Sequence, residues 1–312
     1  MLKVALAYAA AAFMLLLPMG VTGTYVVHVA IMTMIFAILA MGLDLVLGYC
    51  GQYSFAQGAF FGLGAYASAL LALHFGLPFV VTLPLAVVIA AAAGVLLGIP
   101  ALRLSGHFLA ITTIAFQIVV YLIMAQWYGL THGMEGLSGI PAVGSVQILG
   151  TTLARFDTPN GMYYLTLALF GLSVLIAVRL ARSRIGLEWL AIHDDELLAR
   201  ALGVDSMRRK VLAFAVSAAM AGAAGAILAH YLHSIHPAEF SVWTSATILA
   251  MTVIGGRGTV LGPILGAVLL TLLPEVLRSA DEFRLIIYGA LMIIFVTFFP
   301  VGLVGLLRKR GA

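Results

Sequence analysis

Few side chains in this sequence are candidates for chemistry, because 63% of its residues are apolar and only 9% are charged. Asp44 and Glu275 are carboxylates near the ends of apolar runs, and an ion-coupled carrier or channel would depend on one of them. His230, His233 and His236 could suggest a metal site, but histidines so placed beside an apolar run are more often interfacial. An enzyme within the membrane would need paired acids or a histidine cluster there. The sequence therefore predicts no catalytic residue, no metal site and no enzyme.

The chain also lacks the means to bind ATP phosphates through a P-loop. No lysine belongs to a G-x-x-x-x-G-K-[ST] motif, whose backbone and lysine cradle the phosphates. Cys50 is the only cysteine, which excludes an intrachain disulfide and a cysteine-based metal site. If the protein pumps a solute, the energy must arrive from a partner, and no cofactor is expected in this chain.

Charge is concentrated in one block, residues 182–210, with apolar runs on both sides. A charged side chain at the bilayer centre costs about 2.5–3.5 kcal/mol on insertion scales, so this block must lie in water. Asp194 or Asp195 can cap a short helix of about two and a half turns. Glu196 and Arg200 are spaced to pair along that helix.

This helix would end at Gly203, where a left-handed C-terminal turn favours glycine. Leu197, Leu198, Ala201 and Leu202 would share one apolar face, which either packs on its own protein or docks a partner. The expected docking residues are Asp194, Asp195, Glu196, Leu197, Leu198, Ala199, Arg200, Leu202 and Gly203.

Apolar runs long enough to cross about 30 Å of hydrocarbon indicate an all-α polytopic membrane protein. About ten segments are expected, some of them broken or re-entrant, within a single transmembrane domain over 1–312. The segments are 4–20, 25–47, 52–73, 78–101, 107–128, 161–181, 211–233, 243–255, 262–279 and 285–307.

The basic residues predict the orientation of these segments. With both termini in the cytosol, thirteen of the sixteen Lys and Arg residues lie on the inner side, and the outer side holds only Arg155, Arg278 and Arg284. The block 182–210 is then cytosolic and the loop 129–160 is extracytosolic. Because the basic residues collect beside apolar segments, the net charge of +4 indicates topology and lipid contact rather than nucleic-acid binding.

Two glycine-rich stretches share a spacing that suggests a parallel internal repeat. Gly51, Gly58 and Gly62 recur at the same intervals as Gly255, Gly262 and Gly266. The later glycines suit close helix packing, while the first of each set, with polar neighbours, suggests a broken helix. Asp44 could reach the interface or cap the first break, and hydroxyls could bond to their own helix. A substrate pathway would involve Gly51, Gln52, Ser54, Gln57, Thr112, Thr113, Gln117, Gly255, Gly256 and Thr259.

Six motifs distributed over nearly the whole chain resemble one family. They are LGYCGQYSFAQGAFFGLGAYASALL (47–71), GMEGLSGIP (133–141), SRIGLEWLAIHDDELLARALGVD (183–205), KVLAFAVSAAMAGAAGAI (210–227), VIGGRGTVLGPILGAVLL (253–270) and FFPVGLVGLL (298–307). The chain resembles the LivM-type permease subunit of branched-chain amino acid ABC importers. That resemblance implies a bacterial cytoplasmic membrane location, amino acid import, and 183–205 as the segment that couples to an ATPase. Only Ala199 and Gly203 align with the E-A-A-x-x-x-G pattern of many such importers.

The resemblance also implies partners. These are a second permease subunit, two ATPase subunits that bind ATP and Mg, and an extracytosolic binding protein that delivers hydrophobic or branched-chain amino acids. The binding protein would contact the outer loop at Gly133, Glu135, Gly136 and Ser138. A related machine that carries urea or short amides is the alternative, and an ion-coupled carrier or channel is the second.

Overall fold

The computed structural model describes residues 24–102, 104, 106–148, 151–276, 289 and 302–309, with the backbone alone at 145–148, 151–155 and 306–309. Within these ranges six helices are long and apolar enough to cross a membrane. They are α2 (Thr24–Asp44, continued by a π-helical turn at Leu45–Tyr49), α3 (Gln57–Phe75), α4 (Phe79–Ala101), α5 (His107–Gln126), α7 (Pro159–Ala181) and α10 (Ser206–Leu232).

Shorter elements connect and flank these helices. Two apolar helices are too short to span on their own: α11 (Val242–Gly255) and α12 (Leu261–Val276). The other helices are α6 (Tyr128–Thr131), α8 (Arg184–Asp194), α9 (Glu196–Ala201) and α14 (Gly302–Lys309), with 3₁₀ turns η2 (Gly133–Glu135) and η3 (Pro237–Phe240). The strands β1 (Leu137–Ser138) and β4 (Ser234–Ile235) pair antiparallel, as do β2 (Ser145–Ile148) and β3 (Thr151–Arg155).

Most of the predicted segments correspond to helices of the structure. The prediction for 52–73 was wrong at its start, because residues 52–56 are not helical and α3 begins at Gln57. The physical reason is local: Gly51 has φ +70°, and the Ser54 hydroxyl accepts the N–H of Ala56, so the helix cannot continue through this stretch. The predicted segment 4–20 and most of 285–307 lie outside the described residues.

Helix α10 forms the centre of the bundle and packs against α2, α3 and α4. In the most apolar stretch of α10, 67% of the residues are buried, compared with 22% in α7. Helix α7 therefore lies at the periphery of the bundle. Small residues permit the central contacts: a Cβ atom at Gly225 would lie 2.1 Å from the carbonyl oxygen of Phe61, and one at Gly64 would lie 2.3 Å from the Cα atom of Gly222.

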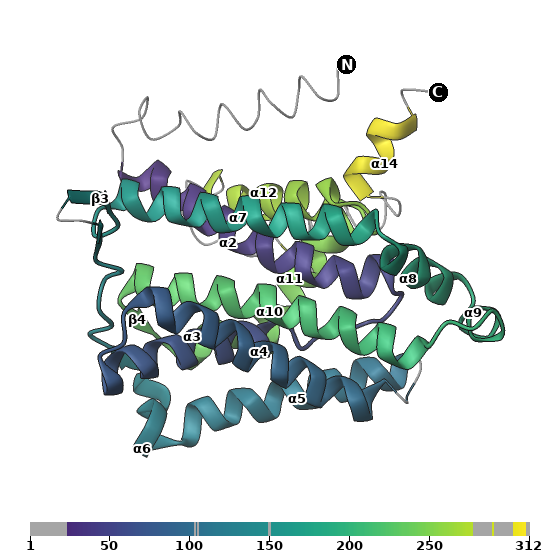
Figure 1. Ribbon diagram of the computed structural model, residues 1–312, viewed down its shortest axis with the longest axis horizontal. Helices are drawn as coiled ribbons and strands as arrows, with labels where there is room; N and C mark the ends of the chain where they lie inside the picture. The colour runs from purple at the N-terminus through teal and green to yellow at the C-terminus, as the bar shows by residue number, and fades with distance from the viewer. Residues whose placement is uncertain are drawn as a thin grey trace.

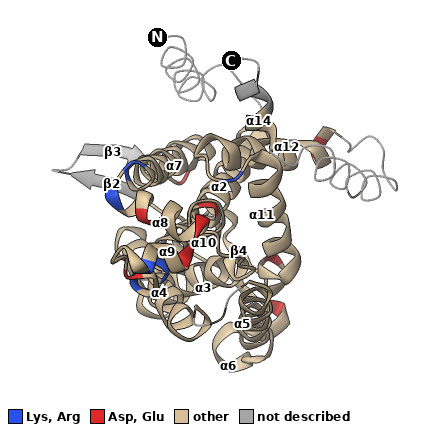
Figure 2. Cartoon of the chain, turned by 90° about the vertical axis from the view of Figure 1, so that its right-hand side faces the viewer, with Lys and Arg blue, Asp and Glu red and all other residues tan. Residues whose placement is uncertain are grey.

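The bundle has two distinct ends (Figure 1). One end carries α8 and α9 and is called here the charged end; the other carries α6 and the strands and is called the strand end. Figure 2 looks onto the charged end, where acidic and basic residues gather around α8 and α9. The block 182–210 and the described part of the loop 129–160 therefore lie at opposite ends of the helices.

Candidate functional site: a docking segment and two helix breaks

The charged block folds into two helices rather than the single one expected. Asp195 has an extended backbone (φ −155°, ψ 105°) and separates α8 from α9. Its Oδ1 atom accepts the N–H groups of Leu197 and Leu198 at 2.9 and 3.0 Å, so Asp195 is the helix cap. Asp194 instead ends α8. The predicted length of two and a half turns was wrong, since α9 holds only six residues.

Two other features of α9 are confirmed. Arg200 pairs with Glu196 at 2.5 Å, four residues apart. Gly203 follows the helix with φ +90°, a backbone conformation that L side chains rarely adopt. Both features join residues close in sequence, which is why the sequence alone could indicate them.

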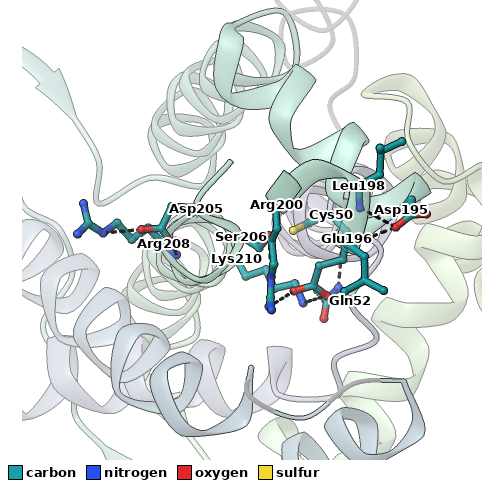
Figure 3. A network of polar contacts seen from close by, with 11 residues as sticks. Cys50, Gln52, Asp195, Glu196, Leu198, Arg200, Asp205, Ser206, Arg208 and Lys210 are labelled. Atoms are coloured by element: carbon teal, nitrogen blue, oxygen red, sulfur yellow. Dashed lines mark hydrogen bonds and ion pairs between the residues drawn. The ribbon is translucent and has the colours of Figure 1, made fainter. Parts of the chain in front are cut away.

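A buried lysine, which the sequence analysis missed, fastens α9 to α10. Lys210 is 2% exposed, and its Nζ atom lies 2.6 Å from Oε2 of Glu196 (Figure 3). Burial alone would raise the pKa of Glu196, but the hydrogen bond and charge of Lys210, together with Arg200, lower it below its ordinary value. The sequence did contain a signal for this tie: Lys210 stands at the start of an apolar span, where an unpaired charge would be costly and a partner is expected.

Helix α8 is anchored to the same part of α10. The Trp189 side chain is fully buried, and its Nε1–H donates to the carbonyl oxygen of Arg209 at 2.8 Å. Glu188 forms an ion pair with the Arg209 side chain. Helices α8 and α9, the candidate docking segment, are therefore both fastened to the central helix.

The apolar face of α9 points away from the described chain. Leu197, Leu198 and Leu202 are 78%, 59% and 76% exposed, while Ala199 is buried against the protein. The sequence left open whether these leucines pack on their own protein or dock a partner. In the structure they do not pack on the described residues of the chain. A surface of three exposed leucines outside the apolar bundle is suited to a partner.

Both predicted helix breaks are present. The first break, residues 50–56, separates the π-helical turn after α2 from α3, and the second, residues 256–260, joins α11 to α12. A Cβ atom at Gly255 would lie 1.9 Å from the carbonyl oxygen of Gly262, so this glycine serves the close packing of α11 on α12. Thr259 caps α12 by accepting the N–H of Gly262 at 3.1 Å.

Asp44 neither reaches the interface nor caps its own break. It is 2% exposed, and its Oδ1 atom accepts the N–H of Gly258, in the second break, at 2.8 Å. Arg257 of the second break donates to the hydroxyl of Tyr53 in the first at 3.1 Å. The two breaks are thus bonded to each other.

A buried polar cluster surrounds the start of α3. The Ser245 hydroxyl accepts the N–H of Gly58 at 2.8 Å and donates to Gln117, which also accepts the N–H of Ala59. The Thr113 hydroxyl accepts the N–H of Phe55 at 3.1 Å. The sequence analysis missed Ser245. The one clue to it was a hydroxyl residue in a short apolar segment that was predicted to be interrupted.

Other predicted pathway residues lie around this cluster or apart from it. Gln57 is buried; it donates to the carbonyl oxygen of Leu39 and accepts from the Ser217 hydroxyl. Ser54 is buried in the first break. The Gln52 side chain donates to the neighbouring carbonyl oxygen of Cys50, and the Thr112 hydroxyl donates back to its own helix, so these two side chains are not brought into the cluster.

At the strand end, the loop that contains 131–141 is fastened to the end of α10. Strand β1 pairs with β4, and the carbonyl oxygens of Ile140 and Pro141 accept hydrogen bonds from the His233 and His230 side chains at 3.0 and 2.8 Å. Glu135 and Ser138 are exposed while Gly133 and Gly136 are buried. Within the described part of the chain, no group of three or more His, Cys, Asp or Glu residues is placed to hold a metal ion.

Comparison with known proteins identifies the family. Residues 25–296 match the model of the branched-chain amino acid transport system permease component. The LivM permease proteins of the high-affinity branched-chain amino acid transport systems of Salmonella typhimurium and Escherichia coli are 36% and 35% identical over 304 residues, covering 91% of this chain and 71% of theirs.

The LivH permease protein of Salmonella typhimurium is 26% identical over 285 residues, which cover 86% of this chain and 91% of that one. No solved structure matches. The family match covers most of the chain, including both helix breaks and the docking segment. With six long apolar helices among the described residues this is a multi-pass membrane protein, and it belongs to the branched-chain amino acid transport permease family.

Proposed function

We propose that this chain is a membrane-spanning permease subunit of an ATP-driven ABC importer for branched-chain and other hydrophobic amino acids. The family and the LivM relatives support the substrate class, and the likeness to LivH supports a second, homologous permease as partner. The energy comes from two ATPase subunits that bind ATP and Mg, because the sequence has no P-loop of its own. The location is the bacterial cytoplasmic membrane.

The observation that carries the proposal is the exposed face of α9. Leu197, Leu198 and Leu202 project from the charged end, while Glu196 and Lys210 fasten the same helix to the bundle. An apolar face on a rigid support is what a docked ATPase needs if its closure is to move the permease as a lever. The positive-inside rule puts this end, and both termini, in the cytosol.

The strand end then faces the binding protein. The exposed Glu135 and Ser138 are available for contact, and the buried glycines Gly133 and Gly136 shape the loop that presents them. Its attachment to α10 through His230 and β4 makes this loop a firm landing surface rather than a loose connector. The expected topology has about ten membrane segments, some of them broken or re-entrant.

The polar cluster at the start of α3 is the proposed substrate pathway. Gln57, Thr113, Gln117 and Ser245 are neutral, which fits a lining that binds weakly while selection occurs on the binding protein. The glycines at 51, 255 and 256 allow the helix breaks beside it, where non-helical backbone is tolerated only inside protein or along a polar path.

Two alternatives are weighed against this proposal. An importer of urea or short amides would use the same docking segment, so only a transport assay separates it. An ion-coupled carrier needs a carboxylate free to bind and release an ion, whereas Asp44 is engaged by the N–H of Gly258.

The test reconstitutes the complete complex and measures leucine and urea uptake in parallel, together with ATP hydrolysis. Leu202→Asp and Leu198→Asp place a charge on the docking face and are expected to abolish substrate-stimulated ATP hydrolysis while the chain still inserts. Leu104→Asp is the matched control, a 41% exposed leucine outside the docking segment. Normal stimulation in the docking variants would refute the ATPase assignment.

A further inference from the structure

We propose that the two helix breaks form a single latch, which the docking segment opens and closes during transport. On one side the latch consists of Asp44 and Gly48, which directly precede the first break, and Tyr53 within it. On the other side it consists of Arg257 and Gly258 of the second break. This inference rests on the proposed function, because it assigns the part of the permease that the ATPases move. Asp44 acts in it as a positioning residue rather than as an ion carrier.

The first line of evidence is that the breaks contact each other across more than 200 positions of sequence. The buried Asp44 carboxylate accepts the N–H of the half-buried Gly258 at 2.8 Å, and Arg257 donates to the Tyr53 hydroxyl at 3.1 Å in an exposed setting. Gly48 lies closely against both Asp44 and Gly258, since a Cβ atom at Gly48 would lie 2.0 Å from Asp44 Oδ1 and 2.3 Å from the N atom of Gly258. The bond of the buried Asp44 carboxylate fixes how the two breaks are aligned. The exposed bond between Arg257 and Tyr53 can be exchanged for bonds to water.

The second line of evidence connects the latch to the docking segment. A Cβ atom at Gly51 would lie 2.7 Å from the ring of His193 and 3.2 Å from its Cα atom, so the end of α8 rests directly on the first break. His193 is two residues before Asp195, the cap of α9. A displacement of α8 and α9 must therefore shift Gly51 or open a gap beside it, because packed protein does not deform continuously.

The third line of evidence connects the latch to the proposed pathway. Four residues after Gly51, the N–H of Phe55 is held by Thr113 of α5, and α3 then begins at Gln57 within the polar cluster. The second break follows α11, the helix that supplies Ser245 to the same cluster. Movement of either break would thus alter hydrogen bonds within the polar cluster at the start of α3, such as those of Thr113 with Phe55 and of Ser245 with Gly58.

The latch is tested by cross-linking in the complete reconstituted complex. Cys50→Ala removes the only cysteine, and Tyr53→Cys and Arg257→Cys are then introduced together. Bifunctional methanethiosulfonate reagents of graded length bridge the two positions, and a reducing agent releases them. The single-cysteine variants, treated in the same way, are the matched controls.

Cross-linking is expected to lower leucine uptake by at least about ten-fold, with recovery on reduction, because the bridge holds one state of a two-state element. The yield of cross-linking should also differ between nucleotide-free and ATP-trapped complexes. That readout does not depend on which solute is carried, so it separates failure of the latch from failure of the proposed substrate. Equal yields in both nucleotide states, or full transport while bridged, would overturn the proposal.

Substitution of Asp44 distinguishes positioning from ion coupling. Asp44→Asn keeps an oxygen that accepts the N–H of Gly258 and should keep uptake within about three-fold of wild type, whereas Asp44→Leu should lose at least about ten-fold. Equal loss in both variants would mean that the charge is what matters, and Asp44 would then not be a positioning residue.

Discussion

The tie between α9 and α10 can be tested by exchanging Glu196 and Lys210, singly and together, for methionine. Methionine keeps the length of either side chain and favours helix, so the change removes charge with little change in volume. The two single variants are predicted to differ greatly although each breaks the same ion pair. The difference comes from burial: Lys210 is 2% exposed, while the Glu196 side chain is 27% exposed.

The magnitudes follow from what each variant leaves behind. At 2.6 Å and an effective dielectric constant of about 20, the gross attraction in the pair is about 6 kcal/mol, most of which is offset by desolvation. In Glu196→Met the buried ammonium of Lys210 loses the acid that neutralises it, which costs about 3–5 kcal/mol of unfolding free energy. In Lys210→Met, Glu196 keeps Arg200 and some solvent, so the cost is about 1 kcal/mol. The double variant should lie near Lys210→Met.

The assay is thermal unfolding of the purified complex in detergent, followed by size-exclusion chromatography after heating. At about 2 °C per kcal/mol, Glu196→Met should melt about 6–10 °C below wild type and Lys210→Met about 2 °C below. The double variant should recover most of the loss. If the two single variants were equally destabilised, or if the double variant were the worst of the three, the pair would not be a buried tie.

Three further outcomes are expected. Burial works to raise the pKa of Glu196, but Lys210 and Arg200 outweigh it and hold the pKa below its ordinary value. The stability that Glu196 contributes is therefore complete above its ordinary pKa and is lost as the pH falls through the lowered one, so the melting temperatures of wild type and Glu196→Met should converge only below that lowered pKa. Gly225→Ala, whose Cβ would lie 2.1 Å from a backbone oxygen of α3, should cost about 1–3 kcal/mol and lower the yield of folded protein, unlike Gly171→Ala, which has open space. His230→Phe removes the bond to the carbonyl oxygen of Pro141 and should speed protease cleavage of the loop 131–141 in intact proteoliposomes.

The sequence predicted those parts of the fold that depend on neighbouring residues. Hydrophobic runs located the helices, the pair at Glu196 and Arg200 located α9, and the left-handed turn at Gly203 located its end. The length of α9 was misjudged at both ends. Its cap is Asp195, the later of the two candidates, and the helix ends at Ala201, two residues before Gly203.

The contacts that matter most for the mechanism could not be predicted in this way. The spacing of glycines indicated two breaks. It did not indicate that Asp44 would accept a hydrogen bond from Gly258 in the second break rather than cap the first break. The contact of His193 with Gly51 likewise depends on how α8 folds back against the bundle. Such contacts join residues far apart in sequence, and their partners are chosen by packing rather than by local pattern.

Helix α10 explains how partners at the two ends can act on one set of breaks. Its 27 residues extend about 40 Å, enough to cross the bilayer without interruption. Lys210, near its start, holds the docking helix, and His230, near its end, holds the outer loop. Because α8 and α9 are fastened to α10, their displacement is expected to carry the start of α10 with them. The two breaks, which precede α3 and join α11 to α12, then allow these three helices to move relative to α10.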